Sequence, residues 1–374
     1  KRAENDQDWY LFDPAEASDL TELYGAAFSK RYREYIKLAE AGKLRTFKKL
    51  SARQQYRQIL MSLQATSHPW LTWKDAINVR ALNNNSGTIH LSNLCTEITL
   101  PQDSKNIAVC NLISLNLSAF LQRDKTWAWD QLEQATRSAV RQLDNLVDIT
   151  STPVEEAIHS NMQNRAVGLG YMGFADILEK LEISYESDTA YELIDQLSEF
   201  ISYYAIDESA NLAKERGSYP NFKGSGWSRG LLPIDTIAAL SKSRQQTVNI
   251  STKQRLDWET LRAKVKKGMR NATLMAIAPT ANISHVTSTT PGLDPQFSQI
   301  FSRSTLNGKF LEVNHNLVAK LKELKLWDEL KDELLINQGD IQGMEQIPQA
   351  VRDVYKTSFQ LSPYAFIEVA ARAQ

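Results

Sequence analysis

Cysteine is scarce in this chain of 374 residues, which contains only Cys95 and Cys110. A secreted disulfide scaffold of this size would use more cysteine, so two thiols favour a reducing compartment and a role in packing or chemistry. No apolar run approaches the roughly 18 residues that a membrane-spanning helix needs. The first residues are polar and lack the apolar segment of a signal peptide, so we expect a cytoplasmic protein.

An excess of either charge is also absent. The 43 Lys and Arg residues nearly balance the 44 Asp and Glu residues, which gives a formal net charge of −1. Such a balance creates no global field that would attract nucleic acid or a membrane surface. An anionic substrate therefore has to be held by a local group of donors. The hydrophobic fraction of 42% is ordinary for a globular protein, and the length allows one large domain or a few small ones.

Helical periodicity dominates the chain. In the clearest example, residues 130–149, apolar side chains from Leu132 to Val147 fall on one stripe. Short buried strands between long helices predict an α/β fold with a largely parallel sheet or barrel, in which chemistry collects at strand ends. Further helices are expected at 16–42, 51–64, 173–182, 189–216, 256–270, 315–324 and 363–374, and strands at 88–91, 107–109 and 274–278.

The first segment with chemical potential is 92–98, Ser-Asn-Leu-Cys-Thr-Glu-Ile, directly after an expected strand. Alternate residues of an extended segment project to one side, so Asn93, Cys95 and Glu97 are expected to face one spot. A neighbouring carboxylate raises the pKa of a thiol, whereas an ionic cysteine nucleophile needs a histidine or a helix N-terminus. The group therefore suits hydrogen-atom chemistry at sulfur, with Glu97 as a base and Asn93 as an orienting group. A packed cysteine with structural neighbours is the alternative.

Two further segments have a functional and a structural interpretation. Cys110 lies fifteen positions after Cys95 and is either a packing residue or a redox thiol in the same pocket. Residues 278–284, Ala-Pro-Thr-Ala-Asn-Ile-Ser, follow an expected strand and are rich in small and hydroxyl side chains. Such a strand-to-loop segment offers N–H groups and hydroxyls to a phosphate. A surface turn is the alternative.

Three glycines at 168, 170 and 173 have the G-x-G-x-x-G spacing of a dinucleotide-binding loop. No clear strand precedes them, and no acidic residue is well placed after them. We therefore interpret the glycines as sites of close backbone approach before the helix expected at 173–182.

In this order, these segments resemble the large (alpha) subunit of ribonucleotide reductase, and the resemblance covers nearly the whole chain. The resemblance implies a ten-stranded α/β barrel with many long helices, incomplete in this chain, with the radical cysteine on a finger loop. Residues 1–374 are then the central and C-terminal part of one catalytic barrel domain. The N-terminal allosteric and specificity region and the C-terminal strand and tail are expected outside it. The matching runs are 93–98, 108–112, 168–176, 211–217, 279–281, 308–314 and 355–358.

The resemblance also implies residue roles. Cys95 becomes a thiyl radical that abstracts the ribose 3′ hydrogen atom, while Asn93 and Glu97 bind the ribose hydroxyls and move protons. Cys110 is half of a redox pair that reduces the 2′ carbon. No metal site is implied in this chain. Substrate binding is expected at Ser92 and at the loop that holds the phosphates, Pro279, Thr280, Ala281, Asn282, Ile283 and Ser284.

The implied activity is the reduction of ribonucleotides to deoxyribonucleotides by a ribonucleoside-diphosphate reductase. The second thiol of the redox pair is expected outside this chain, so the isolated chain is expected to be inactive without companion large-subunit fragments. We expect a radical from a metal-containing small subunit, a thioredoxin- or glutaredoxin-type reductant, no directly bound cofactor and a homodimeric assembly. The alternatives are an adenosylcobalamin-dependent reductase fragment, a non-catalytic assembly fragment, and a thiol hydrolase, for which the sequence places no histidine base.

Overall fold

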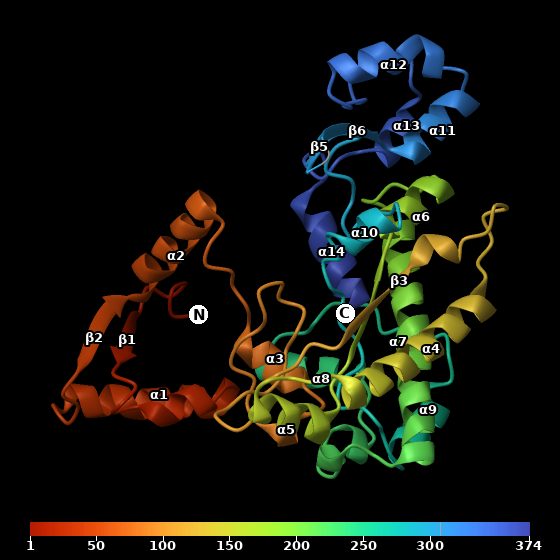
Figure 1. Ribbon diagram of the computed structural model, residues 1–374. Helices are drawn as coiled ribbons and strands as arrows, with labels where there is room; N and C mark the ends of the chain where they lie inside the picture. The colour runs from red at the N-terminus through yellow and green to blue at the C-terminus, as the bar shows by residue number, and fades with distance from the viewer. Residues whose placement is uncertain (307) are drawn as a thin grey trace. The chain divides into compact units, whose positions relative to one another are not determined.

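The computed structural model describes residues 1–306 and 308–374, which form two compact units; Figure 1 labels most of their helices and strands. Unit 1 contains residues 1–108, 153–160 and 223–248, and unit 2 contains residues 109–152, 161–222 and 249–374. Helices and strands alternate along the chain, so the expected α/β class is confirmed. The six strands of the described residues form three two-stranded sheets, and no closed ten-stranded barrel is present among them.

Unit 1 begins with an antiparallel pair of strands, β1 (Asp8–Phe12) and β2 (Phe47–Ser51), connected through η1 (Ser18–Glu22) and α1 (Gly25–Glu40). Tyr32 of α1 is buried against β1, where its hydroxyl accepts a hydrogen bond from Tyr10 N at 2.7 Å and donates one to Tyr10 O at 2.9 Å. The other helices of this unit are α2 (Ala52–Thr66), α3 (Lys74–Arg80), η2 (Asn84–Ser86), η5 (Trp227–Arg229) and α8 (Asp235–Arg244). A further helix, α5 (Glu155–Asn164), begins in it.

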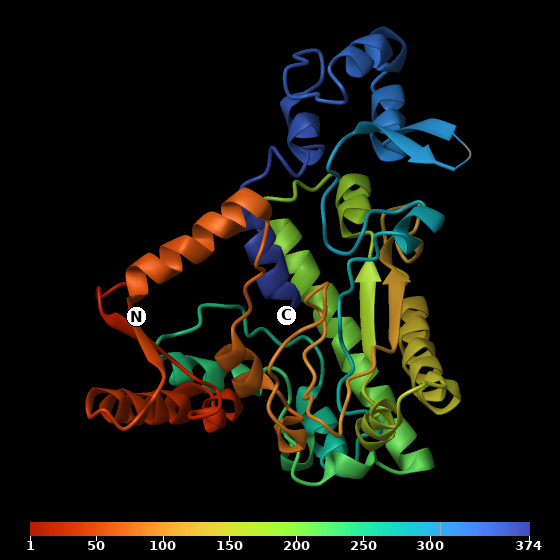
Figure 2. The same cartoon turned by 60° about the vertical axis from the view of Figure 1, so that its left-hand side comes forward.

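The centre of unit 2 is a parallel pair of strands, β3 (Leu112–Asn116) and β4 (Gly168–Met172), drawn side by side in Figure 2. All five residues of β4 are buried. The segment that sequence analysis expected as a strand at 274–278 runs along the other edge of β4. There Leu169 N donates to Leu274 O at 2.6 Å and Ala276 N donates to Leu169 O at 3.0 Å. This segment forms one isolated parallel bridge and no regular strand.

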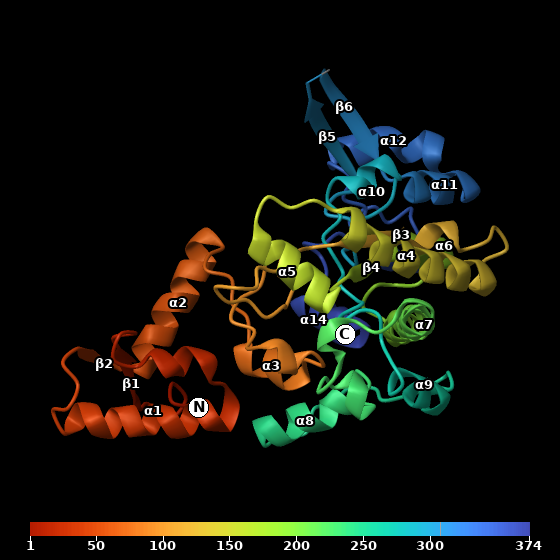
Figure 3. The same ribbon diagram turned by 60° about the horizontal axis from the view of Figure 1, so that its bottom comes forward.

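Two long helices, α4 (Trp129–Ile149) and α7 (Asp188–Arg216), pack against each other in unit 2 (Figure 3). The predicted stripe of α4 is confirmed, because Leu132, Val140 and Leu143 have no exposed surface. After β4 the chain enters the short helix α6 (Phe174–Leu181). The remaining helices are η3 (Leu117–Ala119), η4 (Pro220–Phe222), α9 (Trp258–Val265), α10 (Ile283–Val286), α11 (His315–Glu323), α12 (Trp327–Ile336), α13 (Gln349–Val354) and α14 (Pro363–Ala373).

The third pair of strands is the antiparallel hairpin of β5 (Ile300–Thr305) and β6 (Gly308–Val313). It leads into α11 and α12, which share a core of fully buried leucines with the segment that follows them. In the described part of the chain, no helix has the length and hydropathy to span a membrane.

None of the three expected strands is present as a regular strand: 274–278 forms only the isolated bridge, and the other two segments form no strand. Residues 88–91 form no strand, because the side chain of Asn78 takes the place of a partner strand. Its Oδ1 accepts from Ile89 N and its Nδ2 donates to Ile89 O, both at 2.8 Å. Residues 107–109 are also irregular, since Ile107 N is bonded to Glu156 O, and the strand begins later at Leu112.

The interpretation of the glycines as sites of close backbone approach is confirmed, although they lie in a strand that sequence analysis missed. A Cβ atom on Gly168 would lie 2.6 Å from Leu112 Cδ2 and 2.7 Å from Ala276 Cβ. A Cβ atom on Gly170 would meet the carbonyl oxygen of Ala276 and lie 3.0 Å from Ile277 Cα. Only residues without a side chain allow the neighbouring backbones to come this close.

Candidate active site

Residues 92–98 in unit 1 form a tight loop that is closed at its base by side chains. Thr96 N donates to Asn93 O at 3.1 Å, which makes a turn over Leu94 and Cys95. Ile98 N donates to Asn93 Oδ1 at 3.1 Å, and Ser92 Oγ donates to Ile98 O at 2.7 Å. The expectation of an extended segment is therefore wrong, because the amide of Asn93 folds the chain back on itself.

The same loop brings Asn93 and Glu97 together. Asn93 Nδ2 donates to Glu97 Oε2 at 2.7 Å, and both side chains are partly buried. A carboxylate that accepts a hydrogen bond from a fixed amide is held in one orientation while its other oxygen remains open to a proton donor. The geometry thus suits a positioned base.

Cys95 lies at the exposed tip of this loop and is a free thiol. Leu94 beside it is 79% exposed, which is unusual for a side chain of this size. The tip therefore presents a thiol and an apolar side chain to whatever approaches the loop.

The nearest histidine in sequence, His90, is engaged elsewhere. Its Nε2 lies 3.4 Å from Glu22 Oε2, and its Nδ1 lies 3.5 Å from Lys74 Nζ. A cysteine hydrolase needs a histidine whose nitrogen is open to the thiol. The positions of both ring nitrogens of His90 argue against that chemistry at Cys95.

Cys110 belongs to unit 2 and is exposed just before β3. Cys95 belongs to unit 1, so a pocket shared by the two thiols stays a prediction. Asn111, next to Cys110, is buried and donates from Nδ2 to Asn161 Oδ1 at 2.9 Å and to Ala166 O at 3.0 Å. These bonds fix the backbone from which the Cys110 side chain projects.

The loop expected to hold phosphates follows the bridge segment beside β4, in unit 2. Thr280 and Ser284 are buried, whereas Pro279 and the three residues between the buried pair are exposed. Ser284 N donates to Thr280 O at 3.0 Å, and Gly292 N donates to Thr280 Oγ1 at 2.9 Å. The hydroxyl oxygen of Thr280 accepts the hydrogen bond from Gly292 N, so the hydroxyl can still donate its own proton to an acceptor.

Both candidate loops contain a threonine with left-handed backbone. Thr96 has φ +67° and Thr280 has φ +52°, and they are the only β-branched residues with positive φ in the described part of the chain. This conformation costs a residue other than glycine on the order of 1–3 kcal/mol and persists where the surroundings enforce it. Strain of this kind collects at functional sites, and here it marks the two loops that the sequence singled out.

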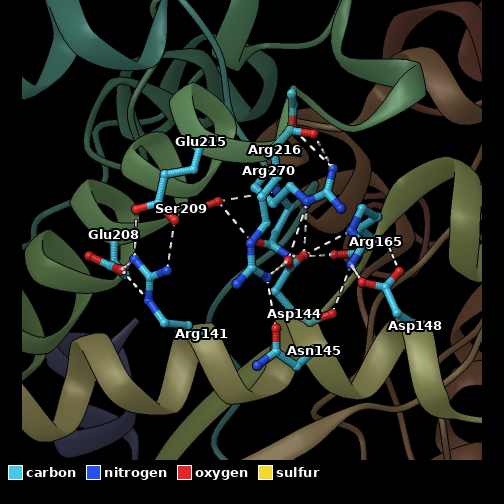
Figure 4. Close-up of polar contacts among 12 residues, drawn as sticks. Arg141, Asp144, Asn145, Asp148, Arg165, Glu208, Ser209, Glu215, Arg216 and Arg270 are labelled. Atoms are coloured by element: carbon cyan, nitrogen blue, oxygen red, sulfur yellow. Dashed lines mark hydrogen bonds and ion pairs between the residues drawn. The ribbon is translucent and has the colours of Figure 1, made fainter.

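A group of buried charges lies around Asp144 of α4 and was not predicted from the sequence (Figure 4). Asp144 has no exposed surface and receives Arg165 at 2.8 Å, Arg216 at 2.9 Å and Arg270 at 3.2 Å. Arg165 precedes β4 and Arg270 precedes the bridge segment, so the group lies at their amino ends. Active sites of parallel α/β folds lie at the opposite, carboxyl ends, so we assign this group a structural role.

Two buried carboxyl groups on α6 were also not predicted from the sequence as a pair, although Asp176 lies in the run 168–176 that contributes to the family resemblance. Asp176 and Glu179 lie one helical turn apart and are 8% and 5% exposed. Burial raises the pKa of Glu179 to about 8. No signal in the sequence distinguishes these carboxyl groups from the solvated ones on other helices. Among the residues that the structure describes, no group of three or more His, Cys, Asp or Glu side chains could hold a metal ion.

Comparison with known proteins gives consistent matches over the whole chain. The family model for the ribonucleotide reductase barrel domain matches residues 1–374. The chain is 43% identical over 377 residues to the ribonucleoside-diphosphate reductase subunit alpha of Chlamydia trachomatis serovar D, covering 100% of this chain and 36% of that protein. It is 35% identical to the large subunit of Caenorhabditis elegans and 32% identical to that of Danio rerio, covering 99% of this chain and 45% of each relative. The chain thus spans less than half the length of these relatives.

Proposed function

The chain belongs to the family of ribonucleotide reductase barrel domains, and from this premise we propose that it carries the radical loop of a reductase large subunit. The proposed activity is the reduction of ribonucleoside diphosphates to deoxyribonucleoside diphosphates. The hydrogen bond of 2.7 Å between Asn93 and Glu97, in the loop that exposes Cys95, is the observation that most supports it.

The proposed reaction begins at the sulfur of Cys95. As a thiyl radical, Cys95 takes the 3′ hydrogen atom, so an S–H bond forms and a C3′–H bond breaks. Glu97 accepts the proton of the 3′ hydroxyl, which makes loss of the 2′ hydroxyl as water easier than an ionic displacement would be. Cys110 and a second thiol from outside this chain together give two electrons and two protons and become a disulfide. The hydrogen atom then returns from Cys95 to C3′.

The substrate is proposed to bind at two loops. The backbone and hydroxyl groups of 279–284 would hold the phosphates, and the 92–98 loop would bind the ribose. Ser92 would act by closing the base of its loop, since its hydroxyl is already bonded to Ile98 O. Asn93 would bind a ribose hydroxyl through the lone pairs of its amide oxygen and keep Glu97 in place.

The rest of the large subunit is proposed to complete the site. Residues 1–374 would be the central and C-terminal part of a ten-stranded barrel whose other strands come from companion segments of the same subunit. The radical would come from a metal-containing small subunit, and electrons from a thioredoxin- or glutaredoxin-type protein. The assembly would be a homodimer of large subunits, and the isolated 1–374 chain would not turn over.

Replacement of Cys95 in the complete large subunit tests this proposal. With the small subunit present, Cys95→Ser is expected to lower turnover by about a thousandfold or more, because the stronger O–H bond of serine prevents radical formation. Ser104→Ala, at an exposed position shortly after the loop, is the matched control and is expected to keep wild-type turnover. Full activity of Cys95→Ser would favour a non-catalytic assembly role. Wild-type activity that requires added adenosylcobalamin would favour adenosylcobalamin as the source of the radical.

A further inference from the structure

Asp176 occupies an unusual place at the carboxyl end of β4. It lies in the first turn of α6, and its Oδ2 accepts three hydrogen bonds from a single turn of the chain. The donors are Thr289 Oγ1 at 2.6 Å, Thr290 N at 2.6 Å and Thr290 Oγ1 at 2.8 Å. Gly173, just before α6, donates from its backbone N to Thr290 O at 2.9 Å. The start of α6 therefore holds residues 289 and 290 through both backbone and side-chain hydrogen bonds.

Residues 289–292 in turn hold the loop at 279–284. Thr289 N donates to Ser284 O at 2.9 Å, and Gly292 N donates to Thr280 Oγ1 at 2.9 Å. Thr280, which has the left-handed backbone, is thus connected to Asp176 through only one intervening strip of chain. A displacement of that strip would break the hydrogen bond to the Thr280 hydroxyl.

The carboxylate of Asp176 is bonded only by neutral donors. It is 8% exposed, and none of the ion pairs of the described residues involves it. Hydrogen bonds from hydroxyl and N–H groups, with Asn316 Nδ2 at 3.3 Å on the other oxygen, surround the carboxylate instead. A buried charge satisfied only by neutral donors is tolerated when all of these donors are held in place, so the arrangement makes the turn rigid.

From this geometry we propose that Asp176 is a positioning residue for substrate binding, because it holds the 289–292 strip and through it the hydroxyl of Thr280 and the backbone of Ser284. The proposal rests on the proposed function, in which residues 279–284 bind the substrate phosphates. It assigns to Asp176 no contact with the substrate. Its effect is on how well the loop is prepared for a phosphate before the substrate arrives.

Glu179 provides a matched control on the same helix. It is as buried as Asp176 and lies one turn later, but its partners are Asn314 Nδ2 and Asn316 Nδ2, each at 2.8 Å. These residues belong to the start of α11 and not to the 279–292 segment, although Asn316 Nδ2 also lies 3.3 Å from Asp176 Oδ1. A variant at Glu179 therefore changes a buried carboxyl group of α6 without touching the strip that holds Thr280.

The test measures steady-state kinetics of the complete large subunit with its small subunit and a ribonucleoside diphosphate. Asp176→Asn replaces a charged acceptor by a neutral one of roughly half the strength, and we expect KM to rise about tenfold while kcat changes less than about twofold. Thr289→Val, which removes one donor without changing shape, is expected to raise KM about threefold. Thr289→Ser keeps the hydroxyl and Glu179→Gln leaves the strip intact, so both are expected to keep the wild-type KM.

An unchanged KM in Asp176→Asn, or an equal rise in Glu179→Gln, would overturn the proposal. If Asp176→Asn does not fold, the comparison of Thr289→Val with Thr289→Ser decides alone, and equal KM values for these two variants would overturn it. Cys95→Ser in the same preparation separates the two claims. An active Cys95→Ser enzyme would refute the proposed function, whereas an inactive one with unchanged KM in Asp176→Asn would refute only the positioning role.

Discussion

The side chains of Asn93 and Glu97 are bonded to each other across the turn that carries Cys95, with Asn93 Nδ2 2.7 Å from Glu97 Oε2. A second bond, from Ile98 N to Asn93 Oδ1 at 3.1 Å, uses the other end of the same amide. Asn93 therefore fixes the loop and orients the carboxylate at once. This double use holds the proposed base and the proposed radical thiol on one short, fixed loop.

Replacement of Glu97 by Gln is expected to lower turnover about 10²- to 10⁴-fold, because an amide does not accept the proton of the 3′ hydroxyl. The loop should keep its shape, since the amide oxygen of Gln still accepts from Asn93. Turnover of the complete enzyme is the measurement. Asp103→Asn is the control, because Asp103 closes the next turn, where it accepts from Lys105 N at 2.7 Å and from Asn106 Nδ2 at 2.9 Å. Equal activities of the two variants would contradict the role of Glu97.

Replacement of Gly170 by Ala is expected to destabilise unit 2 by about 1–3 kcal/mol, because the new Cβ meets backbone atoms of Ala276 and Ile277 that cannot move aside. The midpoint of chemical denaturation measures the effect. Gly343→Ala is the control, since a Cβ atom there meets no atom within 4 Å. Equal midpoints for the two variants would show that the bridge segment does not lie against β4 as described.

Replacement of Asp144 by Asn is expected to cost about 3–5 kcal/mol of unfolding free energy, because it removes the fully buried counter-charge that Arg165, Arg216 and Arg270 share. Asp148→Asn removes a second partner of Arg165, but the Asp148 side chain is 44% exposed, so the expected cost is about 1 kcal/mol or less. Denaturant titration of both variants tests this ranking. A larger loss of unfolding free energy in Asp148→Asn than in Asp144→Asn would contradict the central place of Asp144 in this group of buried charges.

Glu179 is expected to make stability depend on pH. Burial raises its pKa from an ordinary value of 4.5 to about 8, and the charge of Asp176 adds to this, while the amide donors Asn316 and Asn314 act in the opposite direction. Between these two pH values the folded chain holds a proton that the unfolded chain has lost. The contribution of Glu179 to stability is therefore complete below pH 4.5 and is lost as the pH rises to about 8.

Glu179→Gln removes this titration. The unfolding free energy of the wild type minus that of Glu179→Gln should fall between pH 5 and 8 by at most roughly 1.4 kcal/mol per pH unit. Taking the difference cancels the other titrating groups. Denaturation of both proteins over this range is the measurement, and a difference that rises with pH would show that the carboxyl group is ionised in the folded chain.

Long helices were predictable because one face of each must be apolar over many turns, as in α4, where the stripe from Leu132 to Val147 is buried. Strands were not. The Gly-Leu-Gly-Tyr-Met run of β4 lacks β-branched residues, and its extended state depends on β3 and the bridge segment lying beside it. At Ile89 the opposite happened, because one asparagine side chain satisfied a segment that had the composition of a strand.

The candidate site likewise has parts that could be predicted from the sequence and parts that could not. The nearness of Asn93 and Glu97 followed from a short sequence separation, although the cause is a turn and not the alternation of an extended chain. The pair of Asp144 with Arg270 and the pair of Asp176 with Thr289 each join residues more than 100 positions apart. Nothing local in the sequence indicates such pairs, because they exist only once the helices have packed.

The central claim is that Cys95 removes the 3′ hydrogen atom of the substrate, and the isotope effect on that bond tests it most directly. The complete enzyme should convert a 3′-deuterated ribonucleoside diphosphate with a lower kcat/KM than the undeuterated one, and Cys95→Ser should convert neither. Equal kcat/KM values for the two substrates, together with continued turnover by Cys95→Ser, would contradict the account.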